Sequence, residues 1–308
     1  MKRIIKKTYR LKNFFNDDIW TLDLEDLSKA KARFVKYMKV GMITIRTFSS
    51  EKIGFQAVAL SFFSTMAVVP FIAIAFAITG GLGLDDKLAQ LLYAYFNNSQ
   101  QIIDVVLGFA QNIISTAESG GVGLISALLF AWIVIWMMMS VEKVFNNVWR
   151  VHKARNIIKR LSVIIAMLFV SPFIVFVFFG GTVAYSHALS YLGLDMESLS
   201  IVKTLITWIL FSVVATFTFS AMYKFIPNAV VNYKEALRAA IPAGIAFAIV
   251  NYLYLETQVM VTRMNGIFGA FAAVPLFMVW INIGWFIILI GAELSYAFQH
   301  VDNYNIED

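Results

Sequence analysis

Two polar residues, Asn282 and Glu293, stand within the last long apolar stretch of the sequence. Pro275, Asn282 and Glu293 are separated by 7 and 11 residues, and at about 100° per residue they fall on nearly one face of a helix. Polar groups at membrane depth are costly, so this face predicts a polar track that contacts a substrate or a proton. The alternative is that Asn282 forms a hydrogen bond between helices and that Glu293 pairs with a basic loop residue.

A second group of polar residues follows an earlier apolar stretch. Glu142, Asn146 and Trp149 lie about one helical turn apart, and Arg150 follows them. Glu142, Asn146 and Arg150 are therefore further candidates for the polar track or for substrate contacts. Glu142 and Glu293 should reach the same membrane level, where two carboxylates with basic partners could bind a cation or a proton. The basic side chains predict contacts with a lipid phosphate, and the candidates are Arg150, Arg155, Lys159 and Arg160. The alternative is a structural network of ion pairs that closes the helix bundle.

The chain lacks the residues that several kinds of chemistry require. The chain has no cysteine, and none of its three histidines, His152, His187 and His300, has a second metal ligand three or four residues away. No glycine-rich phosphate loop with a following lysine occurs, which excludes ATP-driven transport within this chain. We therefore expect no metal, no cofactor and no enzymatic activity.

Long apolar stretches determine the fold class. Hydrophobic residues make up 60% of the chain and charged residues 14%, whereas a soluble domain has roughly 45–50% and about 25%. A membrane-spanning helix needs about 20 apolar residues, and six charge-free stretches are between 17 and 34 residues long. The sequence predicts an all-α, polytopic membrane protein, a bundle of six transmembrane helices. The predicted spans are residues 55–79, 120–141, 161–185, 204–224, 238–256 and 267–297.

The distribution of lysine and arginine predicts the orientation of these spans. Thirteen precede the first span, six lie between the second and third spans, and three lie between the fourth and fifth. The opposite side has only Lys87, Lys203 and Arg263. Because basic loops stay in the cytoplasm, we expect both termini to be cytoplasmic. The net charge of +6 then comes from basic segments at the cytoplasmic membrane surface and does not indicate nucleic-acid binding.

Three further segments complete the predicted organisation. Residues 1–52 form a cytoplasmic N-terminal region whose amphipathic helix lies on the membrane surface or, alternatively, packs on the loops. Residues 53–298 form the transmembrane domain, with helix kinks at Pro70 and Pro275. Within it, residues 85–117 show helical apolar spacing on both sides of a turn, which predicts an external helical hairpin that rests on the bundle or dips into the bilayer. Residues 299–308 form a cytoplasmic tail.

Three motifs resemble those of the YihY/virulence factor BrkB family. They are EKVFNNVWRVHKARNIIKR at 142–160, YKFIPN at 223–228 and GIFGAFAAVPLFMVWINIGWFIILIGAEL at 266–294. The resemblance implies a bacterial inner-membrane protein with six helices. The family was formerly named ribonuclease BN, but this chain lacks the clustered His and Asp ligands of a metallo-nuclease, so we expect no ribonuclease activity. The motif positions that the resemblance marks here are Asn146, Trp149, Arg150, Pro227, Pro275, Trp280 and Glu293.

Three functions remain open at this point. The first is a transporter or flippase of an envelope lipid or other amphiphile. The second is a sodium or potassium/proton antiporter that uses Glu142 and Glu293, and the third is a non-transporting envelope scaffold. The expected partners are membrane lipids and no nucleic acid. A homo-oligomer is an open alternative, because the small residues Gly180, Gly181 and Ala184 permit close helix approach.

Overall fold

The computed structural model describes residues 28–50, 52–95, 100–118, 121–151, 153, 155–191, 200–262 and 266–302, together with Ile19. In these ranges the chain is helical apart from short turns and contains no strand. The helices are α3 (Lys29–Ser50), α4 (Ile53–Gly80), α5 (Asp85–Tyr95), α6 (Gln100–Glu118), α7 (Val122–Val148), α8 (Ile157–Tyr191), α9 (Ser200–Phe225), α10 (Tyr233–Thr262) and α11 (Gly266–His300). The rest of residues 1–27 and of the C-terminal tail lies outside this part of the chain.

Six helices of the described ranges are long and apolar enough to cross a membrane. Their spanning segments are Ile53–Gly80, Leu128–Val148, Ile157–Ile174, Leu205–Phe225, Tyr233–Thr257 and Val274–His300. The fold class, an all-α membrane protein with six spans, is therefore confirmed. Helix α7 continues to Val148, beyond the expected limit at residue 141, so Glu142 and Asn146 both lie within it. Pro70 and Pro275 lie inside α4 and α11, which continue on both sides of each proline.

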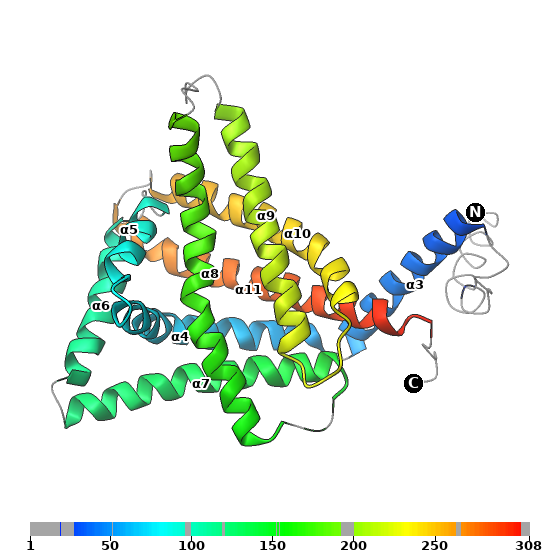
Figure 1. Ribbon diagram of the computed structural model, residues 1–308, viewed down its shortest axis with the longest axis horizontal. Coiled ribbons are helices and arrows are strands. Elements are labelled where there is room, and N and C mark those ends of the chain that lie inside the picture. The colour runs from blue at the N-terminus through cyan, green and yellow to red at the C-terminus, as the bar shows by residue number, and fades with distance from the viewer. Residues whose placement is uncertain are drawn as a thin grey trace.

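The spanning helices divide into two groups by direction. In Figure 1, α4, α7 and α11 run in a similar direction, whereas α8 and α9 cross it steeply. Helix α9 packs along α10 and α10 packs along α11, while α4 contacts both α7 and α11. Helix α8 makes fewer contacts with its neighbours. The proposed small-residue surface, Gly180, Gly181 and Ala184, belongs to the C-terminal half of α8, and these side chains lie outside the described part of the structure.

The main core lies at one end of the bundle. Here α4, α8 and α10 begin and α7, α9 and α11 end, and we call it the basic end because the sequence concentrates Lys and Arg in these segments. Phe145 of α7, Tyr223 of α9 and Leu289 of α11 are fully buried in this core. Gly291 lets α11 approach closely, since a Cβ there would lie 2.8 Å from Cζ of Tyr223 and 2.9 Å from Cβ of Ala243. The helices are thus packed most tightly where the polar motif residues lie.

The predicted amphipathic helix, α3, docks on the C-terminal end of α11. Val40 and Ile43 are buried against Ala297 and Val301. The Tyr37 and Phe298 rings meet edge-on with their centroids 5.7 Å apart, and the Lys36 ammonium lies 2.7 Å from the Asp302 carboxylate. The opposite face remains apolar and open, with Phe34 66% and Ile45 74% exposed. One face is therefore packed on the bundle, and contact of the other with the membrane surface remains a prediction.

The predicted external hairpin corresponds to α5 and α6, which lie at the opposite end from α3 (Figure 1). Leu88 of α5 and Leu107 of α6 are buried against Phe76 of α4. The hairpin therefore packs on α4, and its insertion into the bilayer stays a prediction. The turn at residues 97–99 that the sequence predicts lies outside the described residues.

A hydrogen bond between the two hairpin helices predicts a pH dependence. The Tyr93 hydroxyl donates to Asp104 Oδ1 at 2.5 Å, and this bond raises the pKa of the Tyr93 phenol above its usual value. Because the folded-state pKa is raised, the contribution to stability is complete below the ordinary tyrosine pKa of about 10 and is lost as pH rises through the higher folded value. We expect Asp104→Asn to lower the Tyr93 pKa, measured by phenolate absorbance as a difference from Tyr93→Phe. An unchanged titration in Asp104→Asn would contradict this assignment.

Candidate functional site

Arg150, a predicted contact for a lipid phosphate, is held between three helices. It follows the end of α7 with φ at 53°, a left-handed conformation that is uncommon outside glycine. Its guanidinium donates to Thr47 Oγ1 of α3 at 3.4 Å and lies 5.1 Å from the centroid of the Tyr296 ring of α11. The Trp149 ring meets the Tyr296 ring edge-on. The His300 ring stacks on the Tyr296 ring, with ring centroids 4.2 Å apart. These contacts make Arg150 a connector of α3, α7 and α11.

Arg155, a second predicted phosphate contact, binds backbone carbonyls of a neighbouring helix. Its Nη2 donates to the carbonyl oxygens of Phe225 and Pro227 at 3.0 and 2.8 Å, and its Nε donates to Asn228 Oδ1 at 3.3 Å. Carbonyls at the end of a helix lack partners within the helix, and a cation there also compensates the helix dipole. Arg155 therefore caps the C-terminus of α9.

Asn146, which the sequence assigned to the polar track, joins the same loop to α7. Its Oδ1 accepts the backbone N–H of Asn228 at 2.7 Å, and the Asn228 side chain in turn donates to the Lys153 carbonyl at 3.0 Å. Asn146 is buried, so this bond satisfies a side-chain oxygen that has little access to water. Two of the motifs recognised in the sequence thus meet through Asn146, Arg155 and Asn228.

Glu142 and Arg160 form an ion pair between the end of α7 and the start of α8. Arg160 Nε lies 2.7 Å from Glu142 Oε2, and the exposed fractions of the two side chains are 25% and 6%. This is one ion pair of the kind that the network hypothesis requires, and the wider network stays a prediction. The last predicted phosphate contact, Lys159, is exposed and makes no hydrogen bond or ion pair with the described residues.

The polar residues inside α11 contact α4. Asn282 Nδ2 donates to Ser61 Oγ at 3.2 Å, and one turn later Trp285 Nε1 donates to Ser64 Oγ at 2.8 Å. These are hydrogen bonds between helices, which is the alternative that the sequence left open for Asn282. Glu293 is fully buried in α11. It lies roughly 16 Å further along the axis than Asn282 at about 1.5 Å per residue.

A groove with one polar and one apolar end runs between α4 and α7 at the basic end. Its volume is about 770 Å³, and we call it the basic groove. The polar lining consists of Gln56, Ser140, Lys143, Asn146, Asn147 and Arg160. The apolar lining includes Leu60 and Phe63 of α4 and Trp136 and Met139 of α7. Such a groove can hold a molecule that carries both a polar head and an apolar chain.

Lys143 is the residue of this groove that the sequence interpretation missed. It is exposed, and its ammonium makes no hydrogen bond or ion pair within the described part of the chain. A signal was present, because Trp136, Ser140, Lys143 and Asn147 recur at helical spacing and so share one face of α7. The predicted span ended at residue 141, which placed Lys143 in a loop and hid this pattern.

A second cavity is almost entirely apolar and lies between five spanning helices. It measures about 660 Å³ and is lined by residues of α4, α7, α8, α9 and α11, among them Ala67, Met137, Ala166, Ala221 and Trp285. Three hydroxyl residues line it, Ser64, Ser171 and Thr218, and the two serines bond to Trp285 Nε1 and to the Leu168 carbonyl. The cavity therefore offers apolar surface and few free polar groups.

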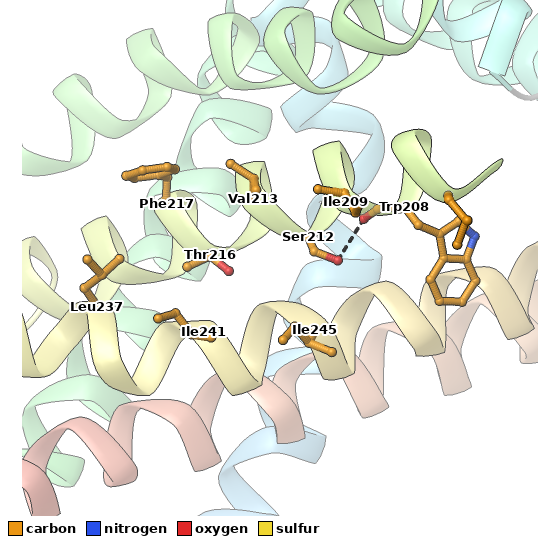
Figure 2. Close-up of a pocket in the computed structure, with 10 residues that line it drawn as sticks. Trp208, Ile209, Ser212, Val213, Thr216, Phe217, Leu237, Ile241 and Ile245 are labelled. Atoms are coloured by element: carbon orange, nitrogen blue, oxygen red, sulfur yellow. Dashed lines mark hydrogen bonds between the residues drawn. The ribbon is translucent and has the colours of Figure 1, made fainter. Parts of the chain in front are cut away.

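A third hollow, of about 570 Å³, lies between α9 and α10, which run side by side (Figure 2). Trp208, Ile209 and Val213 of α9 face it together with Ile241 and Ile245 of α10. Its few polar groups include Ser212, whose hydroxyl donates to the Trp208 carbonyl at 2.8 Å. This hollow matches the apolar exterior that a spanning helix pair presents to lipid.

The described residues contain no group of three His, Cys, Asp or Glu side chains that could hold a metal ion. What the geometry provides is a cationic groove at the basic end and an apolar cavity between the spans. Such features are suited to binding by charge and by burial of apolar surface.

Comparison with known proteins agrees with the recognised motifs. The family described as Virulence factor BrkB matches residues 44–308. A UPF0761 membrane protein of Janthinobacterium sp. (strain Marseille) is 30% identical over 264 residues, which are 82% of this chain and 58% of that protein. A UPF0761 membrane protein of Haemophilus influenzae (strain 86-028NP) is 23% identical over 270 residues, 85% of this chain and 95% of that protein.

The chain spans a little over half the length of several of the longer relatives, as the 58% for the Janthinobacterium protein shows. No solved structure matches the chain. The family match extends over most of the chain, from within α3 to the C-terminus, and includes all six spanning segments. A membrane protein with six spans is consistent with the bacterial inner membrane. The chain belongs to the Virulence factor BrkB family of membrane proteins.

Proposed function

We propose that this protein moves an envelope lipid or a similar amphiphile across the bacterial inner membrane. The observation that carries the proposal is the apolar cavity of about 660 Å³ between α4, α7, α8, α9 and α11. An acyl chain gains little by leaving the bilayer for another apolar site, so such a cavity lets a lipid enter without a large barrier. The steep crossing of α8 and α9 over the other spans (Figure 1) supports entry from the side.

The lining of this cavity favours an amphiphile over a metal cation. Ion-coupled carriers bind their cations near the midplane through carbonyl or carboxylate oxygens. This cavity is lined by no acidic residue, and Ser64 and Ser171 already form hydrogen bonds within the protein. Glu142, which an antiporter would use, is paired with Arg160 at the basic end. We therefore place the antiporter and the scaffold behind the amphiphile transporter.

The proposed orientation puts the basic end, and with it both termini, in the cytoplasm. Lys and Arg concentrate in the segments that meet there, and such segments are retained on the cytoplasmic side. In this arrangement the basic groove faces the inner leaflet, and the α5–α6 hairpin faces the periplasm. The proposed transport requires no covalent chemistry, so the protein acts as a carrier and not as an enzyme.

The test is lipid movement in proteoliposomes. Purified protein is reconstituted with a fluorescent phosphatidylglycerol, and dithionite bleaching reports the fraction of the label that reaches the outer leaflet. We expect the wild-type protein to accelerate this movement over protein-free vesicles. Ala166→Phe, which places a ring at the cavity, should reduce the rate at least several-fold because the ring occupies the space of the chain.

Ala77→Phe is the matched control, since Ala77 is also an exposed alanine of a spanning helix but does not line the cavity. It should retain the wild-type rate. Equal rates with and without the wild-type protein would refute transport of this lipid class. Sodium and potassium flux measured in the same vesicles would then show whether the antiporter takes its place.

A further inference from the structure

We propose that the basic groove binds an anionic lipid, with the head-group phosphate between Lys143 and Arg160 and an acyl chain along Phe63 and Trp136. This inference rests on the proposed function, because it names the class of amphiphile that the protein takes up. The site lies at the basic end, in the groove between α4 and α7, apart from the apolar cavity between the five spans.

The charges of the groove favour an anion. Lys143 and Arg160 both line it, and no acidic residue does. The Lys143 ammonium has no partner within the described residues, so its three N–H donors are available. Within the same residues, the Arg160 side chain uses only its Nε, toward Glu142 Oε2 at 2.7 Å. The remaining guanidinium donors can therefore receive phosphate oxygens while Glu142 holds the side chain in place.

The order of residues along the groove matches a lipid and not a free anion. Asn147 lies in the last turn of α7 and Lys143 one turn deeper, whereas Trp136 lies roughly 16 Å from Asn147 along the axis at about 1.5 Å per residue. On α4, Gln56 is in the first turn and Phe63 lies two turns further into the span. Phe63 and Trp136 contact each other with ring centroids 6.0 Å apart. Polar groups thus stand at the end of the bundle and apolar rings at depth, as in the leaflet itself.

Two other arginines of the basic end are engaged by the protein, and Lys159 lies outside the groove. Arg155 donates to the carbonyls that end α9, and Arg150 contacts Thr47 and the Tyr296 ring. Lys159 is exposed beside Arg160 in the sequence but does not line the groove. A site defined by Lys143 and Arg160 should therefore differ from general attraction of a basic surface to anionic lipid.

The experiment measures binding of a short-chain phosphatidylglycerol to the full-length protein in a neutral detergent, by native mass spectrometry and by titration of tryptophan fluorescence. We expect phosphatidylglycerol to bind more tightly than phosphatidylcholine of equal chain length. Lys143→Gln should weaken phosphatidylglycerol binding about tenfold, as expected for one charge-assisted hydrogen bond, and should leave phosphatidylcholine binding unchanged. Lys143 is exposed, so this variant should fold like the wild type.

Lys159→Gln and Lys234→Gln are the matched controls, because each removes one exposed lysine of the basic end outside the groove. Both should bind phosphatidylglycerol like the wild type. An equal loss in Lys143→Gln and Lys159→Gln would overturn the site in favour of diffuse surface attraction. Equal affinity for the two lipids would overturn the anionic specificity. Displacement of the lipid by millimolar inorganic phosphate alone would show a free-anion site and would also overturn the proposal.

The same variants separate this inference from the proposed function. If Lys143→Gln loses phosphatidylglycerol binding while the wild type moves no lipid in proteoliposomes, the site stands and transport fails. If the wild type moves lipid, and Lys143→Gln binds and moves the lipid at wild-type levels, transport stands and the site fails.

Discussion

Gly244→Ala is expected to lower the free energy of unfolding by about 2–3 kcal/mol, because it forces apart two closely packed spans. A Cβ at Gly244 of α10 would lie 2.9 Å from the backbone N of Thr216 and 3.1 Å from the carbonyl oxygen of Ser212, both in α9. Backbone atoms of a helix cannot move aside as a side chain can, so α9 or α10 must shift. Thermal unfolding of the purified protein in detergent, followed by tryptophan fluorescence, measures the change.

Gly41→Ala provides the matched control. Gly41 lies inside α3, and no atom lies within 4 Å of the position that its Cβ would take. Alanine is a better helix former than glycine by about 0.5–1 kcal/mol, so this variant should be neutral or slightly more stable. If both glycine variants had the same unfolding midpoint, the close approach of α9 and α10 would not be a determinant of stability.

Arg160→Gln is expected to cost about 3 kcal/mol, because it leaves the buried Glu142 carboxylate without its cation. The Glu142 side chain is 6% exposed, so water does not replace the lost partner. The Arg160 side chain is 25% exposed, so we expect a loss of stability at the lower end of the range for breaking a fully buried ion pair. The change is measured by thermal unfolding in detergent without added denaturant. Lys159→Gln is the control for the loss of one exposed charge.

The double variant Glu142→Gln with Arg160→Gln distinguishes the two explanations for such a loss. If the cost comes from an unpaired carboxylate, removing that charge should recover more than half of it. If the double variant is as unstable as the sum of the two single variants, the pair does not interact energetically, and the ion pair would be incidental to stability.

The six spans were predictable because the bilayer leaves the chain little choice. Apolar stretches of 17 residues or more must be buried in hydrocarbon, and backbone groups there must bond within the helix. The positions of α3 and of the α5–α6 hairpin were predicted from the helical spacing of their apolar residues. Boundaries were less predictable, since a charged residue does not end a helix. Helix α7 continues past Glu142 and Lys143 to Val148, and this extension creates one wall of the basic groove.

The roles of individual polar residues depended on contacts between distant parts of the chain. The sequence identified Asn146 as a motif residue and Arg155 as a candidate phosphate contact. The Asn146 side chain meets a residue 82 positions away, and Arg155 meets carbonyls 70 and 72 positions away. Spacing within one helix shows which residues share a face and does not show what that face contacts. Two predicted phosphate contacts, Arg150 and Arg155, thus connect or cap helices, whereas the unremarked Lys143 remains available to a ligand.

Local physics therefore defines the helices of this protein, and tertiary packing defines its surfaces. Hydropathy, charge bias and helical period each act over one or two dozen residues, which is enough to predict six spans and a basic end. A groove or a cavity exists only where side chains of different helices fail to fill the space between them. The positions of Phe63 beside Trp136, of Glu142 beside Arg160 and of the apolar cavity between five helices follow from how the spans cross, and only the folded structure contains that information.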